Sequence, residues 1–281
     1  MINDKPLIPK DIAAFIIFGL GILMLYPIVW LIFASFKEAN QIFSDQSLVP
    51  KTWTLQNYVE GWKGIGIVSF ATFFGNSFFL SFSCMLANAV FCSMTAYAFA
   101  RLNFRGKRIW FAIMLLTLML PGHVTTIPRF VIFRMFGWID TYLPFVVPKI
   151  LGGDAFFIFL LVQFMRSLPK EMDESAFMDG CSKFGIYLKI ILPLSIPALI
   201  TTVLFTFLWT WDDFFSQMIF LNSTHLFTVP LGLRLFLDSS GVSSWGSMFA
   251  MSVLSLIPCF VLFISLQRYF VQGIATTGIR E

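Results

Sequence analysis

Charged residues are scarce in this sequence of 281 residues. Asp, Glu, Lys and Arg together make up 12% of it, whereas hydrophobic residues make up 58%. A soluble globular domain usually carries about twice that charged fraction. The scarcity therefore excludes a soluble globular chain, a disordered chain and a nucleic-acid-binding chain, and it indicates an integral membrane protein. The 36 Phe residues agree with this, because a surface that faces lipid accepts Phe freely.

Residues that carry chemistry are equally rare. The phosphate-binding loop GxxxxGK[ST] does not occur, so we expect that the chain does not hydrolyse ATP itself. The only histidines are His123 and His225, and neither an HExxH nor a GxSxG motif is present, which disfavours a membrane hydrolase or transferase. Three of the four cysteines lie in apolar stretches, so we expect no disulfide framework. The sequence predicts a protein that is not an enzyme and that binds no cofactor or metal of its own.

Long uncharged stretches predict the membrane spans, since about 20 apolar residues are needed to cross roughly 30 Å of hydrocarbon. Six stretches meet or nearly meet this length, which predicts an all-α integral membrane fold with six transmembrane helices. The weakest stretch spans the membrane only if its two charged residues, Lys149 and Asp154, lie at the outer interface. The predicted spans are Ile12–Ser35, a helix within Gly64–Ala100, Ile109–Pro128, Val147–Met165, Ile190–Trp211 and Met248–Leu266.

The distribution of Lys and Arg predicts the orientation. Six spans place both termini on one side of the membrane, and twelve of the 19 basic residues lie on that side. The densest cluster is Arg101–Arg108. Because basic residues are enriched in cytoplasmic loops, both termini are expected in the cytoplasm. The outer segment Pro121–Pro148 is expected to be partly helical or re-entrant, and the whole chain is expected to form one membrane domain.

The inner segment between the fourth and fifth predicted spans has the start and stop signals of a short helix. Pro169 suits a first helical turn, and the acidic residues that follow it suit the positive end of the helix dipole. A short helix is therefore predicted from about Pro169 to Asp179, ended by a left-handed Gly180, with Ser182 capping the next helix. One narrow face of small and apolar residues with acidic flanks suits docking in a protein groove better than in a lipid surface. That face comprises Met172, Ser175, Ala176 and Asp179.

This segment resembles a known family motif. Glu174-Ser-Ala, then Gly180, then Ile190-Ile-Leu-Pro193 is similar to the EAA motif of permease subunits of ATP-binding-cassette (ABC) importers, with Ser175 in place of the middle Ala. Nearly the whole chain is similar to carbohydrate importer permeases of the maltose-type class, and most similar to their six-helix member. The resemblance extends to Trp209-Thr-Trp-Asp-Asp-Phe214 and Gln267-Arg-Tyr-Phe-Val-Gln-Gly273.

The resemblance implies a type I ABC importer (MetI-like) permease fold and a set of partners. These are a second homologous permease, two cytoplasmic ABC ATPases that bind ATP and Mg, an extracytoplasmic solute-binding protein, and a sugar, with oligosaccharides favoured over monosaccharides. It also implies a bacterial or archaeal cytoplasmic membrane, core helices at about 67–268 and a peripheral first helix at 12–35. The segment 169–182 would be the coupling helix, seated in a cleft of the ATPase.

The family also implies roles for particular residues. The coupling contacts would come from Met172, Glu174, Ser175, Ala176, Asp179 and Gly180, where the glycine lets the chain turn at a point at which a Cβ would clash. The C-terminal tail of the corresponding subunit reaches between the two ATPases. Contacts there would come from Gly278, Ile279 and Arg280.

The end of the fifth predicted span suggests a sugar pathway. Asp212 lies about 28 Å from Pro193 at helical rise, toward the outer side of the membrane. Carboxylates that face lipid there are costly, and Trp rings offer flat faces for sugars, so the pathway residues are expected among Trp209, Trp211, Asp212 and Asp213. The alternative is an interfacial Trp belt with an Asp pair that meets headgroup water.

A second class of function is an ion-coupled secondary carrier that transports by itself. Such carriers bury titratable groups near the middle of a span. The five firmest spans have none there, which disfavours this class. The sequence does not identify the sugar, and acidic oligosaccharides stay open.

Overall fold

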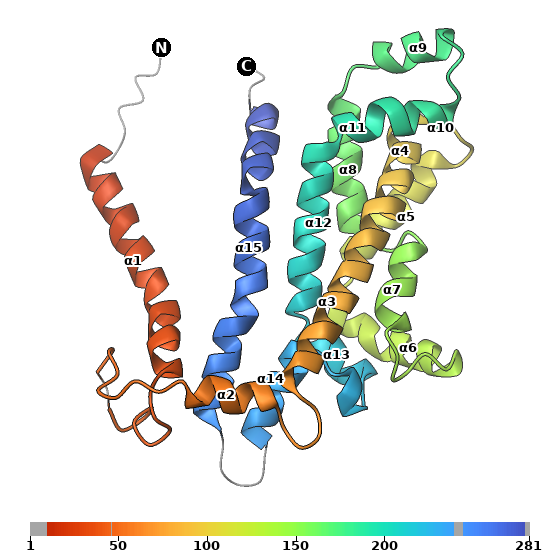
Figure 1. The fold of residues 1–281 in the computed structure, drawn as a ribbon. Helices are drawn as coiled ribbons and strands as arrows, with labels where there is room; N and C mark the ends of the chain where they lie inside the picture. The colour runs from red at the N-terminus through yellow and green to blue at the C-terminus, as the bar shows by residue number, and fades with distance from the viewer. Residues whose placement is uncertain (1–9, 46, 239–243, 279–281) are drawn as a thin grey trace. The chain divides into compact units, whose positions relative to one another are not determined.

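The computed structural model describes residues 10–45, 47–238 and 244–278, and every regular element within these ranges is a helix (Figure 1). The chain forms two compact units. One comprises Met1–Phe70 with Leu233–Leu256, and the other comprises Ala71–Gly232 with Ile257–Glu281. The site described below lies within the second unit.

The first unit contains α1 (Lys10–Ser35), α2 (Gln56–Lys63), most of α14 (Val229–Asp238) and the first part of α15 (Trp245–Gly278). Almost all other helices belong to the second unit. In chain order they are α3 (Phe70–Ala87), η1 (Asn88–Cys92), α4 (Ser93–Arg101), α5 (Lys107–Leu118), α6 (Gly122–Met135), α7 (Leu143–Ile150), α8 (Ala155–Ser167), α9 (Glu171–Met178), α10 (Lys183–Ile186), η2 (Tyr187–Ile191), α11 (Leu192–Leu194), α12 (Ile196–Trp211), α13 (Phe214–Phe220) and η3 (Thr224–Leu226).

Each of the six predicted spans has a counterpart in the structure. Four helical segments are long and apolar enough to cross a membrane, and two further segments qualify as pairs of helices joined by a bend. The four are Asp11–Ser35, Phe70–Arg101, Leu143–Ser167 and Trp245–Arg268. The bent pairs are α5 with α6 and α12 with the helical segment before it. The all-α membrane fold is therefore confirmed.

The prediction of one helix over Ile109–Pro128 was wrong. The chain there forms α5 and α6, whose axes differ by 105°. Pro121 causes the break, because proline cannot donate a backbone hydrogen bond and disfavours helical geometry in the residue before it. The outer segment Pro121–Pro148 is partly helical, as one of the two expectations had it: Pro121 directly precedes α6, and α7 begins at Leu143.

The prediction of one helix over Ile190–Trp211 was also wrong. The helical segment Lys183–Leu194 and α12 are bent by 77° at Ser195. Prolines on both sides of the bend explain it, since Pro193 and Pro197 lie in the first turns of the two helices that flank Ser195, where proline is tolerated. The membrane-crossing part, α12, is 16 residues long, or about 24 Å.

The fourth span is longer than expected and is interrupted. Predicted as Val147–Met165, it runs from Leu143 to Ser167 with a break between α7 and α8. Two glycines form the break: Gly152 has φ +81°, and a Cβ on Gly153 would lie 2.2 Å from the Pro148 carbonyl oxygen. Because α8 alone covers only roughly 20 Å, α7 is needed to complete the crossing.

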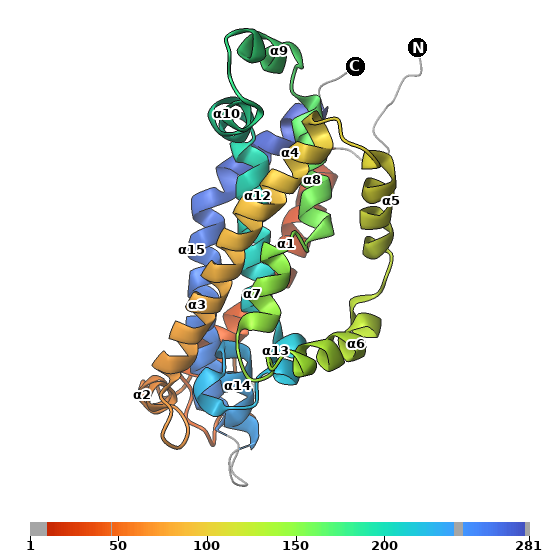
Figure 2. The ribbon, with the colours of Figure 1, turned by 90° about the vertical axis from the view of Figure 1, so that its right-hand side faces the viewer.

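Apolar contacts between α4 and α8 form the main core of the second unit. On α8, Phe157, Leu161 and Met165 are fully buried, as expected for residues four apart on one helix face. They pack with Cys92, Ala96 and Tyr97 on the other side of the core. Within this unit, α9 and α10 lie at the end where α4 terminates, and α6 and α13 lie at the opposite end (Figure 2).

In the first unit, a buried lysine organises the loop that follows α1. Lys37 is 2% exposed, and its ammonium group donates to the carbonyl oxygens of Asp45 and Ser47 at 2.8 and 2.6 Å. The Asn57 side chain holds the end of α1 by donating to the carbonyls of Ser35 and Lys37. The apolar window of α1 itself is not buried within the described structure.

Candidate functional site

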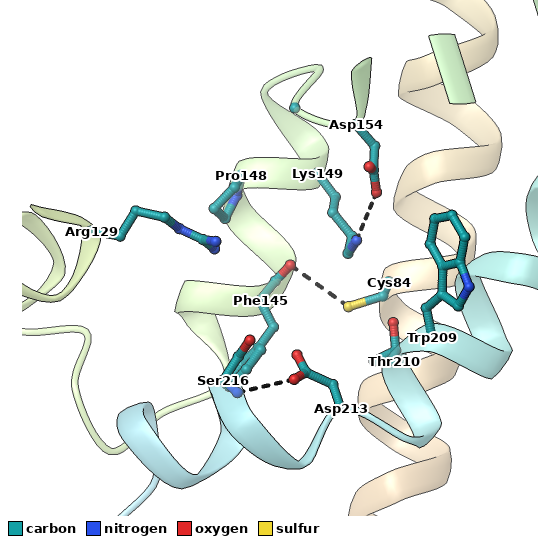
Figure 3. Close-up of a pocket in the computed structure, with 11 residues that line it drawn as sticks. Cys84, Arg129, Phe145, Pro148, Lys149, Asp154, Trp209, Thr210, Asp213 and Ser216 are labelled. Atoms are coloured by element: carbon teal, nitrogen blue, oxygen red, sulfur yellow. Dashed lines mark hydrogen bonds and ion pairs between the residues drawn. The ribbon is translucent and has the colours of Figure 1, made fainter. Parts of the chain in front are cut away.

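The second unit encloses a cavity of about 400 Å³ in which charged and aromatic side chains converge (Figure 3). Four of its lining residues carry a formal charge: two cations and two carboxylates. The lining residues come from α3, α6, α7, the break before α8, α12 and α13. They are Cys84, Arg129, Phe145, Pro148, Lys149, Gly153, Asp154, Trp209, Thr210, Asp213 and Ser216.

Lys149 and Asp154 form an ion pair in this cavity, with the Lys149 Nζ and Asp154 Oδ2 atoms 2.9 Å apart. The same carboxylate oxygen accepts a hydrogen bond from the Asn88 amide at 2.9 Å. Asn88 is fully buried near the middle of the Phe70–Arg101 span. The expectation that the pair lies at the outer interface is therefore wrong: it lies beside the midpoint of a neighbouring span, because α7 and α8 share the crossing.

Asn88 connects three spans through its side chain. Besides Asp154, its amide nitrogen donates to the Thr206 hydroxyl on α12 at 3.0 Å. Asn88 begins η1, a π-helical turn, and such turns occur often at functional sites because they redirect side chains. Asn88 was not among the residues predicted from the sequence, although a carboxamide in the charge-free stretch Gly64–Ala100 is the signal that could have indicated it, since a buried amide needs partners.

Arg129 and Asp213 complete the charged lining. The Arg129 guanidinium lies over the rings of Phe133 and Phe220, 5.6 and 6.0 Å from their centroids, which is cation–π geometry. Among the described residues, no carboxylate forms an ion pair with Arg129 within 4.0 Å. Asp213 caps α13 by accepting from the Ser216 backbone N–H at 3.0 Å through Oδ1. Arg129 thus keeps N–H donors, and Asp213 keeps an acceptor oxygen, for a ligand.

The four residues predicted to line a sugar pathway lie in three different environments. Trp209 and Asp213 line the cavity. Trp211 is 4% exposed and stacks on Phe207, with ring centroids 5.3 Å apart, so it belongs to an aromatic core. Asp212 is exposed and does not line the cavity.

The cavity chemistry suits a polyhydroxylated ligand. Trp209 lines the cavity and about half of its surface is exposed, while its ring also contacts the rings of Phe156, Phe157 and Phe205. The exposed part of the indole is suited to contact the C–H surface of a sugar ring. Arg129 supplies donors and Asp213 supplies an acceptor, and hydroxyl groups of Thr210 and Ser216 lie among them. The cavity therefore offers both stacking and hydrogen bonding.

A second candidate element is the short helix α9 with the turn that follows it. The predicted helix is confirmed as Glu171–Met178, with acidic residues in its first turn. Gly180 has φ +82°, as predicted for a helix stop. The Ser182 hydroxyl caps α10 by accepting from the Gly185 N–H at 3.1 Å. A Cβ at Gly180 would have no heavy atom within 4 Å, so the backbone angle and not a clash within the chain requires glycine.

The residues of α9 divide into an inner and an outer set. Ala176 is buried against the core of the second unit, so it anchors the helix from inside. The other expected contact residues, Met172, Glu174, Ser175 and Asp179, are exposed. The sequence analysis missed Phe177 and Met178, which are 63% and 84% exposed. The sequence feature that could have indicated these two residues is an adjacent apolar pair in an otherwise polar segment.

The expected tail contacts fall largely beyond the described part of the chain. Gly278 is the last residue of α15, and Ile279 and Arg280 lie outside the described residues.

Comparison with known proteins gives a consistent result. Residues 89–276 match the family described as binding-protein-dependent transport system inner membrane component. The arabinooligosaccharides transport system permease protein AraQ of Halalkalibacterium halodurans is 32% identical over 93% of this chain and 93% of its own. The trehalose/maltose transport system permease protein MalG of Thermococcus litoralis is 31% identical, again over 93% of both chains.

A solved structure shares the fold. It is one chain of a bacterial ABC transporter involved in the import of the acidic polysaccharide alginate. The TM-score is 0.81 at 22% sequence identity, and the match covers 95% of this chain and 100% of that chain.

Proposed function

Because the chain belongs to the family of binding-protein-dependent transport system inner membrane components, we propose that it is a permease subunit of an ABC importer that moves an oligosaccharide into the cytoplasm. A second permease would complete the passage, and an extracytoplasmic binding protein would deliver the sugar. Two partner ATPases would bind ATP and Mg, because this chain has no phosphate-binding loop of its own. The chain itself would be non-catalytic.

The observation that carries this proposal is the combination of α9 with the charged cavity in one unit. The exposed pair Phe177 and Met178, flanked by acidic residues, is suited to an apolar groove with a basic rim on a partner. The cavity near Trp209 and Asp213 offers stacking and hydrogen bonding to a sugar. The relatives named for arabinooligosaccharide and for trehalose/maltose transport support the substrate class.

We also propose a membrane topology for the chain. It forms one membrane domain, has both termini in the cytoplasm and has a peripheral first helix. The unburied apolar window of α1 supports a helix that packs on lipid or on the second permease. The basic cluster Arg101–Arg108 supports a cytoplasmic position for the end of α4, beside α9.

Co-purification tests the proposal. A tagged chain solubilised from its native membrane should retain a related permease and a subunit with the GxxxxGK[ST] loop. Replacing Phe177 and Met178 by Asp should release the ATPase and keep the permease. A matched control exists at the opposite end of the unit, where Met135 and Phe136 are 80% and 62% exposed; the same replacement there should keep the ATPase. Isolation of the wild-type chain without any ATPase would contradict the proposal.

A further inference from the structure

A buried arginine links the docking helix α9 to the end of a membrane span. Arg101 is the last residue of α4, and its side chain is 3% exposed. One of its terminal nitrogens lies 3.5 Å from the Asp173 carboxylate in the first turn of α9. The other donates to the carbonyl oxygen of Leu168, directly after α8, at 2.8 Å. One guanidinium thus bridges α4, the end of α8 and α9.

The hydrogen bonds of this link are incomplete. The Arg101 Nε and Nη1 atoms and the Asp173 Oδ1 atom are buried without a hydrogen-bond partner among the described residues. Burial raises the pKa of the Asp173 carboxyl, although the positive charge of Arg101 opposes that rise. A buried ion pair with unsatisfied atoms contributes little to stability, because desolvation of both ions offsets their attraction. The pair therefore calls for a role other than holding the fold together.

A space lies beside the pair, on the side of α9 that faces α4 and α10. A cavity of about 460 Å³ lies between α4, α9 and α10, lined among others by Tyr97, Arg101, Asp173 and Phe177. Of the α9 residues, Ala176 alone is buried. Ala176 packs into the core and Asp173 pairs with Arg101, whereas the remaining side chains of α9 are exposed.

The middle of the same span lies beside the charged cavity, which Cys84 lines. From Phe70 to Arg101 the backbone is continuously helical, and Asn88 lies about 20 Å from Arg101 at helical rise. Asn88 holds Asp154, whose carboxylate pairs with Lys149 in the cavity lining. One continuous helical segment therefore connects Arg101 with the cavity.

We propose that Arg101 is a positioning residue that transmits the movement of α9 to the Phe70–Arg101 span through its ion pair with Asp173. This inference rests on the proposed function, in which α9 docks on an ATPase. The incomplete contact closes into a full pair when the docked ATPase pushes α9 toward α4. That closure moves Asn88 and reshapes the cavity.

The test is the number of sugar molecules transported per ATP hydrolysed by the whole complex in proteoliposomes with the binding protein. Arg101→Ala and the nearly isosteric Asp173→Asn should each lower this ratio roughly tenfold, a size typical of coupling between sites. Both variants should keep the ATPase bound and its basal rate unchanged. The charge exchange Arg101→Asp with Asp173→Arg should restore at least part of the ratio, which would show that the attraction between the two positions, and not either residue alone, sets the ratio. A merely structural role of the pair predicts instead that the single variants lose assembly or the basal ATPase rate together with the ratio.

A control separates this pair from basic residues in general. Arg166 lies at the same end of the unit and contacts the ring of Phe111 and the Phe99 carbonyl. Arg166→Ala should keep the wild-type ratio. A wild-type ratio in Arg101→Ala or in Asp173→Asn would overturn the inference, as would failure of the charge exchange to rescue. If the wild-type complex does not couple sugar transport to ATP hydrolysis, the proposed function fails. If the wild-type complex couples them and the variants behave like it, only this inference fails.

Discussion

Lys149 and Asp154 face each other across the break between α7 and α8, with Nζ and Oδ2 2.9 Å apart, beside the buried Asn88. The pair retains some contact with the cavity, since the two side chains are 22% and 27% exposed. An ion pair in the middle of a span is costly unless it is complete. Because both charges are paired here, each one offsets the desolvation cost of the other.

Removing one partner should therefore destabilise the protein. Lys149→Met or Asp154→Leu alone should lower stability by about 2 kcal/mol, less than the roughly 3 to 5 kcal/mol of a fully buried pair, because cavity water screens the remaining charge. The double variant should recover most of the loss. Thermal unfolding of the purified permease pair in detergent measures this. Lys51→Met, which breaks the exposed Lys51–Asp45 contact, serves as the control and should change little.

The two tryptophans at the end of α12 should behave differently. Trp209→Ala should raise the sugar concentration for half-maximal uptake with normal assembly, because this side chain lines the cavity. Trp211→Ala should instead lower stability by about 3 kcal/mol, since it removes a buried ring from an aromatic core. Asp212→Ala should leave uptake unchanged. Uptake assays and thermal unfolding on the same preparations compare the three, and equal effects of both Trp variants on uptake alone would contradict the assignment.

Gly180 should be required for coupling more than for folding. Gly180→Trp places a side chain at φ +82°, which costs about 1 to 2 kcal/mol of local strain. Gly137, at φ +70° and equally open, provides a matched control with the same strain. We expect Gly180→Trp to insert normally but to abolish sugar uptake or ATPase binding, and Gly137→Trp to retain both. Full uptake by Gly180→Trp would show that α9 does not dock as proposed.

The sequence predicted the parts of this molecule that depend on local chemistry. Apolar length located the four helical segments that are long enough to cross a membrane and the two bent pairs. Gly180 with Ser182 correctly predicted the turn after α9, because backbone angle and capping are properties of neighbouring residues. The bends at Pro121 and Ser195 were missed, since hydropathy measures apolar length and not the direction of the axis. The position of the Lys149–Asp154 pair could not be predicted in the same way, because it depends on a contact with Asn88 on another span, and a carboxamide in an apolar stretch indicates a need for partners without identifying them.

The Asp140 carboxylate should make the free energy of unfolding depend on pH only at acidic pH. Its carboxylate accepts hydrogen bonds from the Ser223 hydroxyl and from the backbone N–H groups of Ser223 and Asn222, and these bonds lower its pKa. Because the folded pKa is lower than the unfolded value of about 3.9, the stabilisation is complete above that value and is lost as the pH falls through the folded pKa. Asp140→Asn should thus be less stable than wild type by roughly 1 to 3 kcal/mol at neutral pH.

Unfolding midpoints measured between pH 7 and pH 3 follow this effect. The difference between wild type and Asp140→Asn should stay constant down to about pH 4 and should shrink below it. A difference that grows in acid would contradict the role assigned to the hydrogen bonds of Asp140.

The most direct test of the account is sugar uptake by the purified complex in proteoliposomes, with ATP on the ATPase side and the loaded binding protein on the other. The account predicts uptake that requires ATP, the ATPase and the binding protein, and that persists when ionophores remove proton and sodium gradients. Uptake by this chain alone that is driven by an ion gradient and abolished by the ionophores would contradict it and favour an ion-coupled carrier.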